Sequence, residues 1–490
     1  MATILAPSAN ADIPYIGILD VGPSSNGLIR SLRARFPKEK RHLFIYKKLQ
    51  NTLDFSMNVF DTYPGLRDAT PSDKSFLINF LSTIISSDDE TFPIDKMISK
   101  VIDLVYARFA DSATGTPKRY IKSLSPEVDE ELERLNIDPS GKSWWFLVDK
   151  LFEAGSIHQS KLAQRFAVPL LEDCITVAQS ESQISSIYSK PKVSTGETAL
   201  EFFCRSISEA ISMYPIVSQH TVFDLGDAKV ISLDLNDVGK TSGSATDNKR
   251  ASTMFMLGRY IIGKNIKQDD SLIKLSPPMY HKYHNKNIDI NKTLVKKICI
   301  DEFHNAAKIP SFVSQVVTDM REGRKWKLEI VLASQFYTDF TDEIINAATT
   351  IQILSGGDVY DEIGDKFKLN RATRQVVKSR LNGATDFGVP YIFKVITKAG
   401  TFVQFLYNSM CPLEILSYST TAEDNQLLDE VSKLIGYLAA VNEISSKYPK
   451  GFKRHLEDDV GDSLDDTISV YEAEAILIAR DYNNKRTRLR

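Results

Sequence analysis

The sequence predicts an α/β protein in which a mostly parallel sheet is interrupted by a large helical insertion. Three observations carry this prediction. Near the start, a buried strand, a turn-rich loop, a helix and a second strand follow one another, which is the order found in parallel sheets. Strands of the same kind resume after residue 228. Between 70 and 220 the apolar residues instead recur at helical spacing.

The first strand is expected at 13–20, where a buried run ends in Asp20. A loop rich in Gly, Pro and Ser follows, then a basic helix and a second strand at 42–47. In the insertion, a hydroxyl residue followed by proline marks helix starts at 70–71 and 125–126. These signals place the first elements of the sheet before the insertion.

The second half contains further strands and one well-marked helix. The helix at 310–322 has one apolar face, and Gly323 is expected to be its C-cap. The last two strands are expected to pair antiparallel through the turn at 398–400. The predicted strands are 228–235, 294–300, 328–334, 349–354, 389–396 and 402–408. The predicted domains are 1–69 (first part of the α/β domain), 70–220 (helical insertion), 221–415 (second part of the α/β domain) and 416–490 (helical tail).

Composition excludes several classes of protein. The 490 residues are 42% hydrophobic, which excludes wholesale disorder. With 60 Lys and Arg against 63 Asp and Glu, the net charge of −3 argues against tight DNA binding over the whole surface. The four cysteines form no CxxC pair, so they are expected to be buried, reduced thiols in a cytosolic protein. No segment approaches the roughly 18 apolar residues of a membrane helix, and the basic residues of a signal peptide are missing before Arg30.

The strongest chemical signal is the predicted strand at 294–300, which is followed by Asp301 and Glu302. A hydrophobic strand that ends in two carboxylates is the Walker B pattern of nucleotide hydrolases. There the first carboxylate holds Mg²⁺, usually through water, and the second polarises the water that attacks the γ-phosphate. A buried strand followed by a solvated acidic turn would look the same, so this segment alone leaves both interpretations open.

Polar side chains also follow the neighbouring strands. Gln335 comes directly after the strand at 328–334, where P-loop motors carry a residue that senses the γ-phosphate. Asp20 and Asp234 end two further predicted strands. Because ligands of open α/β sheets bind along the carboxyl ends of the strands, these residues are expected to share one ligand-binding edge with Asp301 and Glu302.

Three basic residues, Arg321, Arg324 and Lys325, are expected between the helix at 310–322 and the next strand, at the opposite edge of the sheet. From there they would reach their own nucleotide poorly but could reach a neighbour's in a ring, where an arginine stabilises charge on the transferring phosphate. A basic helix end favoured by the macrodipole is the alternative, and spacing alone favours it.

The sequence contains no complete phosphate-binding loop of the form GxxxxGKS/T. The triplets at 141–143 and 239–241 have the Gly-Lys-Ser/Thr ending. However, Asn136 and Asp234 occupy the positions where the first glycine is needed. Both triplets are therefore interpreted as chance matches.

Several segments together resemble the C-terminal ATPase region of the IcmB/DotO-type proteins, the cytosolic ATPases of type IVB (Dot/Icm) secretion and IncI conjugation. The segments include ILDVGPSSNGLI, SWWFLVDKLFEAG, VISLDLNDV, ICIDEFH and DMREGRKWKLEIVLASQFYTDF, and the resemblance covers roughly 13–410. It implies a RecA-like P-loop NTPase fold that uses ATP and Mg²⁺. It also implies a hexameric ring at the cytoplasmic face of the bacterial inner membrane, which works with channel components and energises channel assembly or substrate transfer.

Residue by residue, the resemblance implies that Asp301 is the magnesium carboxylate and Glu302 the catalytic glutamate. Gln335 matches the glutamine after the next strand, Arg324 and Lys325 match a Gly-Arg-Lys motif, and Asp20 would lie on the nucleotide side of the sheet. In the family a Walker A loop precedes the strand at 13–20, where this sequence has no room for one. The resemblance therefore implies a truncated, split or degenerate chain. In such folds the P-loop strand is internal to the sheet, so its absence would leave two strands with unpaired backbone edges. Either an upstream partner chain supplies the missing strand, or the chain is marginally stable alone.

Three functions follow from this. The first is an ATPase motor subunit, with negligible turnover expected of this chain alone. The second is a degenerate, non-catalytic scaffold subunit that contributes only Arg324 or Lys325 to a neighbour. The third is a DNA-translocating motor, which is weakened by the net charge and by the lack of basic stripes interleaved with aromatic residues.

Overall fold

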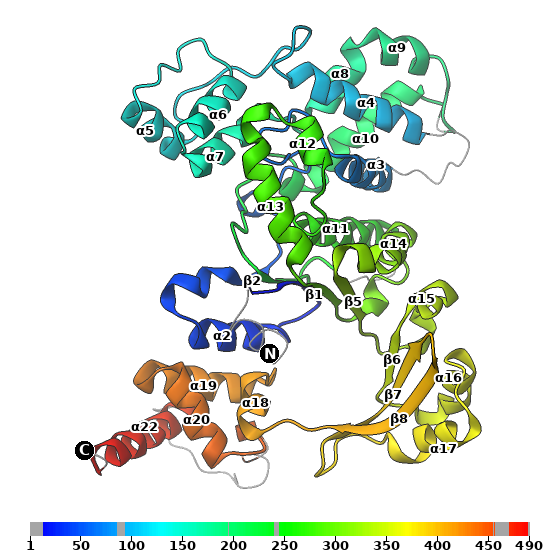
Figure 1. The fold of residues 1–490 in the computed structure, drawn as a ribbon. Helices are drawn as coiled ribbons and strands as arrows, with labels where there is room; N and C mark the ends of the chain where they lie inside the picture. The colour runs from blue at the N-terminus through cyan, green and yellow to red at the C-terminus, as the bar shows by residue number, and fades with distance from the viewer. Residues whose placement is uncertain are drawn as a thin grey trace.

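The structure is a computed structural model that describes residues 13–85, 94–194, 196–239, 245–453, 455 and 470–488. Its centre is a five-stranded parallel sheet of order β2-β3-β1-β4-β5 (Figure 1). The strands are β1 (Tyr15–Asp20), β2 (Phe44–Lys48), β3 (Val230–Asp234), β4 (Lys296–Ile300) and β5 (Leu328–Leu332). The predicted α/β class is confirmed, with strands from before and after the helical segment paired in one sheet.

Helices cover both faces of the central strands, which explains why β1 and β3 are buried along their whole length. One face carries α11 (Ala245–Gly263) and α14 (Pro310–Trp326), and the other carries α2 (Asn26–Arg35). Close packing of α11 requires a glycine in β1, because a Cβ at Gly17 would lie 2.7 Å from the Cβ of Ile262. The two layers of helices fix the sheet on which the site is built.

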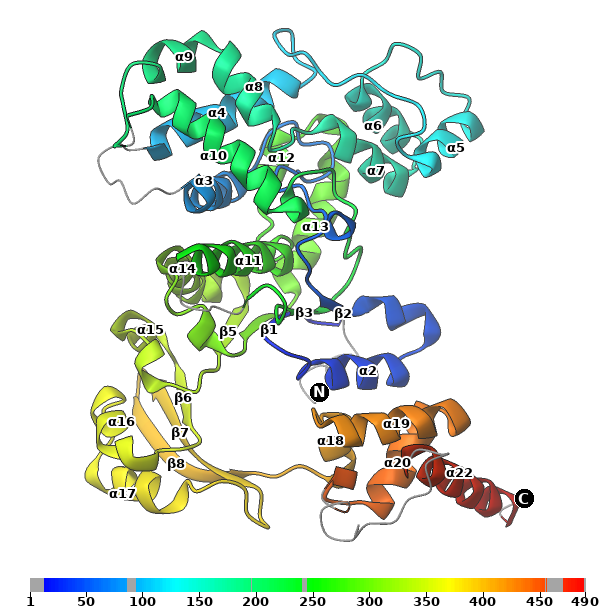
Figure 2. The ribbon, with the colours of Figure 1, turned by 180° about the vertical axis from the view of Figure 1, so that it is seen from behind.

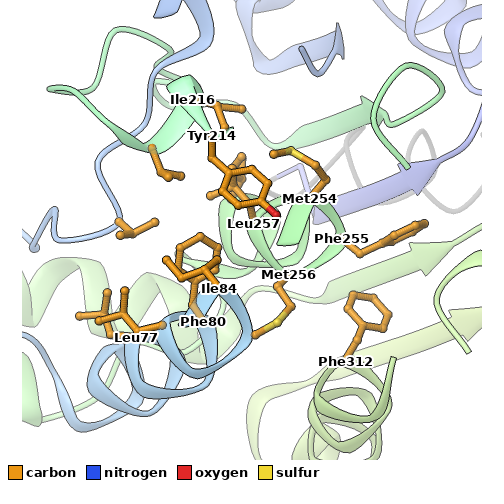
Figure 3. Packing of buried hydrophobic residues seen from close by; sticks show 14 of the residues in the cluster. Leu77, Phe80, Ile84, Tyr214, Ile216, Met254, Phe255, Met256, Leu257 and Phe312 are labelled. Carbon is orange, nitrogen blue, oxygen red and sulfur yellow. The ribbon is translucent and has the colours of Figure 1, made fainter. Parts of the chain in front are cut away.

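Helix α11 also joins the sheet to the helical segment (Figure 3). Phe80 and Ile84 of α3 (Pro71–Ile85) face the same cluster as Met254 of α11. The rings of Phe255 and Phe312 lie 5.7 Å apart and connect α11 with α14. Burial of each such side chain contributes about 1.5–3 kcal/mol, so the helical segment and the sheet stabilise one another.

The segment expected to be a helical insertion contains α-helices and no named strand between 71 and 213 in its described parts. Ser143 caps α6, accepting a hydrogen bond from the backbone N–H of Phe146 at 3.2 Å, so the triplet at 141–143 starts a helix of the insertion. In the other triplet, the structure describes only Gly239. The helices of this segment are α3, α4 (Ile94–Phe109), α5 (Pro126–Arg134), α6 (Trp144–Glu153), α7 (Ile157–Ala167), α8 (Asp173–Ser180), α9 (Ser182–Tyr188) and α10 (Ala199–Met213).

A second, three-stranded sheet follows the parallel one. It has the order β6-β7-β8 and is antiparallel. Its strands are β6 (Thr350–Ile353), β7 (Val389–Thr397) and β8 (Gly400–Asn408), so the predicted hairpin through 398–400 is confirmed. Helices α16 (Tyr360–Lys366) and α17 (Arg371–Arg380) pack on one of its faces. The remaining helices before this sheet are α12 (Ser271–Leu275), α13 (His281–Thr293) and α15 (Asp342–Ala347).

The C-terminal helices form a small unit with a core of its own and lie against α2 (Figure 2). Arg30 of α2 pairs with Asp429 at 2.5 Å. Close approach requires Gly27, because a Cβ there would lie 2.2 Å from the carbonyl oxygen of Ser417. The helices are α18 (Pro412–Ser417), α19 (Ala422–Ile435), α20 (Tyr437–Lys447) and α22 (Val470–Arg488). Within the described ranges, no helix combines the length and the apolar character needed to cross a bilayer.

The expected end of the helix at 310–322 is wrong. Helix α14 continues to Trp326, and its C-cap is Lys327, whose φ of 51° is left-handed. Gly323 lies inside the helix, where a Cβ would come 2.6 Å from the carbonyl oxygen of Leu328. The glycine therefore allows β5 to begin close to the helix rather than ending it. As a result, Arg324 and Lys325 lie on the last turn of α14 and not in a loop.

Candidate functional site

The register of the parallel strands brings the predicted carboxylates to one edge. Asp20 at the end of β1 is paired with Asp234 at the end of β3. On the other side, Leu19 is paired with Ile300, so Asp20 lies beside Asp301. The backbone N–H of Asp301 donates to the carbonyl of Leu19 at 2.8 Å and extends the ladder by one residue. The expected ligand-binding edge therefore exists, with a carboxylate at the end of three neighbouring strands.

Asp20 is buried and organises the loop that follows β1. Its Oδ2 accepts hydrogen bonds from the Ser24 hydroxyl at 2.5 Å, the Ser25 hydroxyl at 2.8 Å and the Ser25 backbone N–H at 3.0 Å. The loop in turn places the Ser24 hydroxyl 3.5 Å from Oδ2 of Asp301. Asp20 thus holds the serine that faces Asp301, and direct contact of Asp20 with a nucleotide stays a prediction.

Asp234 is the counterpart of Asp20 on β3, and it is also buried. Its Oδ1 accepts from the backbone N–H groups of Gly22 at 3.0 Å and Asn236 at 2.8 Å, and its Oδ2 accepts from the Tyr46 hydroxyl at 2.8 Å. Burial, followed by this bond to the carboxylate, raises the pKa of Tyr46, so its phenol remains a donor. Asp234 therefore fixes the loops that follow β1 and β3.

Asp301 keeps one oxygen available. Its Oδ1 accepts from the backbone N–H of Glu302 at 2.9 Å, whereas its Oδ2 has, among the described residues, only a long contact of 3.5 Å with the Ser24 hydroxyl, which also donates to Asp20. A single free carboxylate oxygen suits Mg²⁺, which usually keeps several waters and binds one or two carboxylates plus substrate phosphates. In the described part of the chain, no three His, Cys, Asp or Glu side chains gather as a metal site. The donor set at Asp301 therefore fits a magnesium ion held largely by water and phosphate.

Glu302 has a left-handed backbone, with φ of 49°. Non-glycine residues in this region cost about 1–3 kcal/mol and occur where the surrounding structure enforces them, often at active sites. Here the next residue is tied to the adjacent strand, because the backbone N–H of Phe303 donates to the carbonyl of Ala333 at 2.7 Å. The turn directs the Glu302 carboxylate toward the end of β5.

The Glu302 carboxylate is held by a side chain from the next strand. Nε2 of Gln335 lies 3.0 Å from both Oε1 and Oε2 of Glu302, and it donates to them. On the other side, Nδ1 of His304 lies 3.0 Å from Oε2. About 30% of the Glu302 side chain remains exposed, so solvent reaches it. The predicted pair of Glu302 and Gln335 is therefore brought together, beside Asp301.

A groove of about 430 Å³ runs along the sheet face beside Asp301. Its floor is formed by Ile18, Cys299 and Val331 from three neighbouring strands, and Ser24 lies on its rim. Helix α2 does not extend over the β5 end of this face, and Val331 is 38% exposed. The site therefore opens toward the outer strand β5.

The predicted basic residues are not part of this arrangement within one chain. Arg324 and Lys325 precede β5, whereas Gln335 follows it, and a five-residue strand spans about 16 Å. Arg324 is exposed, and the Lys325 ammonium lies 4.7 Å from the centre of the Trp326 ring. Any role at Asp301 and Glu302 would have to involve a different copy of the chain, and it stays a prediction.

Two contributors to the site were not assigned from the sequence. Ser24 was expected only as part of a turn-rich loop, although a serine four residues after a strand-ending aspartate is a signal for a loop that folds back on the carboxylate. Tyr418, just after α18, lines the groove from the C-terminal helices. No local pattern could have placed it there, because its position depends on the docking of α18 against α2.

A separate cavity of about 220 Å³ lies between the helical insertion and α13. Several of its charged and polar side chains are engaged with the protein: Arg165 pairs with Asp224, Lys264 donates to the carbonyl of Asp61 at 3.1 Å, and His284 bonds to the carbonyl of Pro64 at 2.8 Å. These contacts tie the insertion to the sheet, and the carboxyl edge remains the better candidate for chemistry.

Comparisons with known proteins find similarity among solved structures only. No family model matches the chain, and no curated protein matches it. Among solved structures, the chain is similar to VirB4 of Thermoanaerobacter pseudethanolicus, with a TM-score of 0.47 and 13% identity over 82% of this chain and 83% of that one. At this distance, the function is argued from the residues of the chain itself.

Proposed function

We propose that this chain is the metal-binding and water-activating part of an ATPase. The observation that carries the proposal is the constellation at the ends of β4 and β5, where Glu302 is held by Gln335 directly beside Asp301 and its free oxygen. These are the groups that nucleotide hydrolysis needs to hold Mg²⁺ and to orient the attacking water. A solvated acidic turn would not require a strained backbone and a two-oxygen contact with a neighbouring strand.

The roles of the residues follow from their contacts. Glu302 is exposed enough to accept a hydrogen bond from a water and to take its proton, while Gln335 keeps both carboxylate oxygens in place. Asp301 would bind Mg²⁺ through water at Oδ2, and Ser24 would position that water. The ion, when bound, neutralises charge that develops on the phosphate. Asp20 acts as a positioning residue, because it holds Ser24.

The phosphate-binding side has to be supplied by another segment. No GxxxxGKS/T motif occurs in the sequence, so no lysine is assigned to the β- and γ-phosphates. In the described part of the chain, β4 pairs directly with β5, so the internal gap expected for a missing P-loop strand is not present. Among its described strands, the parallel sheet has unpaired edges only at the outer ones, β2 and β5. We propose that a parallel strand carrying the phosphate-binding loop adds to β5. Such a strand would end at the same edge as Glu302, next to the open groove.

At a finer level, we propose that the ATPase belongs to a type IVB (Dot/Icm-like) secretion or conjugation apparatus at the cytoplasmic face of the inner membrane. The resemblance of segments such as ICIDEFH supports this. A hexameric ring in which Arg324 or Lys325 reaches a neighbour's nucleotide is consistent with the exposure of both residues at the opposite edge. Channel components would be the partners.

The proposal is tested by complementation. Mixing the 490-residue chain with a fragment from the same source that carries GxxxxGKS/T and its strand should raise the melting temperature of the chain, because a free sheet edge becomes paired. A fragment whose loop lysine is replaced by alanine is the matched control for nucleotide: it should still raise the melting temperature, but addition of Mg²⁺ and ATP should cause no further rise. No shift with either fragment would contradict the proposal.

A further inference from the structure

Strand β8 is the outer strand of the small sheet. It pairs along its whole length with β7, from Thr397 opposite Gly400 to Val389 opposite Asn408. In the described part of the chain, no strand pairs with its other side. Every second residue of this nine-residue strand therefore presents its backbone N–H and C=O to solvent. Long open edges of this kind invite another strand.

The sequence of β8 lacks the features that usually protect an edge. The strand GTFVQFLYN contains no charged residue and no proline. The outer strands of the parallel sheet differ: β2 ends in Lys47 and Lys48, and β5 carries Glu329. The uncharged run continues beyond the strand to Leu413. Among the strands that the structure describes, only β6 is similarly uncharged, but it has four residues.

The side chains of β8 are also unusually apolar for their exposure. Phe402 is 56% exposed and Tyr407 is 41% exposed. The face of the sheet that carries Phe402 also carries Phe393 and Leu406, while α16 and α17 cover the opposite face. Figures 1 and 2 show both helices on one side of the small sheet. The uncharged strand β8 therefore leaves open both its outer edge and the face of the sheet that carries Phe402.

We propose that β8 is a self-association surface, on which a second copy of this chain pairs antiparallel with β8 about a two-fold axis at Gln404. The strand is complementary to itself in this register: Phe402 would lie opposite Leu406, Val403 opposite Phe405, and Gln404 opposite its own copy. The two pairs next to the axis are apolar, Thr401 would lie opposite Tyr407, and Gly400 would lie opposite Asn408 at the ends. The two small sheets become one continuous six-stranded sheet, twice the size of the sheet in one chain.

The absence of charge identifies a second copy as the occupant. A foreign strand would gain specificity from charges placed opposite charges, and β8 offers none. A two-fold contact has the opposite requirement, because any charge near the axis would meet itself. Gln404 at the axis satisfies this, since two amides can bond to each other. The contact is isologous and does not depend on the nucleotide site or on the ring proposed above.

The test is the molar mass of the full chain in solution, measured by light scattering over a range of micromolar concentrations. Without nucleotide and without the phosphate-binding fragment, conditions that do not favour the ring, the wild type should approach twice 55.1 kDa. The Gln404→Lys variant should have half that mass, because two ammonium groups would meet at the axis with their Cβ atoms about 5 Å apart. Gln352→Lys is the matched control. Gln352 and Gln404 flank Phe393 on the same face, but Gln352 is on β6. The Gln352→Lys variant should therefore have the same mass as the wild type.

A charge swap separates loss of the contact from loss of the fold. Gln404→Lys and Gln404→Glu should each give the lower mass, and mixing the two variants should restore the higher one, because lysine then faces glutamate. A wild type of 55.1 kDa at every concentration would overturn the proposal. So would a Gln404→Lys variant with unchanged mass, or a mixture of the two variants that fails to reassociate. If Gln352→Lys halves the mass instead, the contact lies on the open face or on β6, and pairing through β8 is wrong.

Discussion

The carboxyl edge of the parallel sheet has two halves that use the same residue type differently. At the ends of β1 and β3, Asp20 and Asp234 are only 2% and 3% exposed, and loop donors occupy their oxygens. At the end of β4, Asp301 keeps an oxygen free, and Glu302 is solvent-accessible. A carboxylate at a strand end is therefore not a ligand in itself. The loop that follows decides whether it holds the fold or faces a substrate.

The amino edge repeats this division with positive charge. Lys296 is buried, and its ammonium donates to the carbonyls of Asn291 at 2.6 Å and Trp326 at 2.8 Å, at the C-terminal ends of two helices. Arg324 and Lys325, which directly precede Trp326 in the last turn of α14, are exposed. Buried charges on both edges should therefore affect stability, and exposed charges should affect function. The following predictions, ordered by size of effect, test this comparison.

The largest effect is expected at Glu302. In an assembly complemented with the phosphate-binding fragment, Glu302→Gln should lower the rate of ATP hydrolysis by about 10³-fold, because the base that takes a proton from water is lost. The melting temperature should stay close to that of the wild type. Steady-state phosphate release measures the rate. Glu343→Gln is the control, since it removes an exposed glutamate of α15 and should leave the rate unchanged. Equal rates for all three proteins would favour the scaffold function.

The next effect separates the two halves of the edge directly. Asp20→Ala should lower the free energy of unfolding by about 3 kcal/mol, because three donors of the loop lose their acceptor in a buried site. Asp301→Ala should change it by less than about 1 kcal/mol. Urea unfolding followed by circular dichroism measures both. If the two substitutions destabilise the chain equally, the distinction between a structural and a functional half is wrong.

The buried lysine gives a pH dependence. Burial lowers the pKa of Lys296 to about 8, below its value in the unfolded chain. Between pH 8 and 10 the unfolded state therefore binds more protons than the folded state, and stability should rise with pH by up to about 1 kcal/mol per pH unit. Lys296→Met should flatten this rise, while Lys292→Met, an exposed change on α13 four residues before Lys296, should retain it. A slope that persists in Lys296→Met would contradict the assignment.

The smallest effect concerns the backbone at Glu302. Because its φ of 49° is strained for any residue with a Cβ, Glu302→Gly should be more stable than Glu302→Ala by about 1 kcal/mol. Both variants lose the contact with Gln335, so the comparison isolates the backbone. Thermal unfolding of the two variants under identical conditions measures the difference. Equal stability would mean that the turn after β4 relaxes without the glutamate.

The elements of the sheet and the pairing within the site could be predicted from sequence. Buried runs of Ile, Val and Leu mark strands, and parallel register then carries their last residues to one edge, which is why Glu302 and Gln335 were expected together. The expectation of buried thiols is right only for Cys174, since Cys204 and Cys299 are half-buried and Cys411 is exposed. Cys411 is exposed because it precedes α18 at the surface rather than lying in a strand or core helix.

What the sequence could not provide depends on close approaches between distant segments. Gly323 looked like a helix end because glycine is common there, whereas its role is contact with the start of β5. Likewise, Gly27 permits α18 to touch α2, and this contact carries Tyr418 to the groove. The serine bridge between Asp20 and Asp301 needs both the register and the loop conformation. None of these contacts leaves a periodic pattern in the sequence.

The central claim is that the chain carries the metal-binding and water-activating residues of a nucleotide site and lacks the phosphate-binding loop. The most direct test is ATP hydrolysis by the 490-residue chain, measured alone and together with the fragment that carries GxxxxGKS/T. We expect negligible hydrolysis by the chain alone and by the fragment alone, and hydrolysis by the mixture. Robust hydrolysis by the chain alone that is abolished by Glu302→Gln would contradict the account, as would a mixture that binds together but remains inactive.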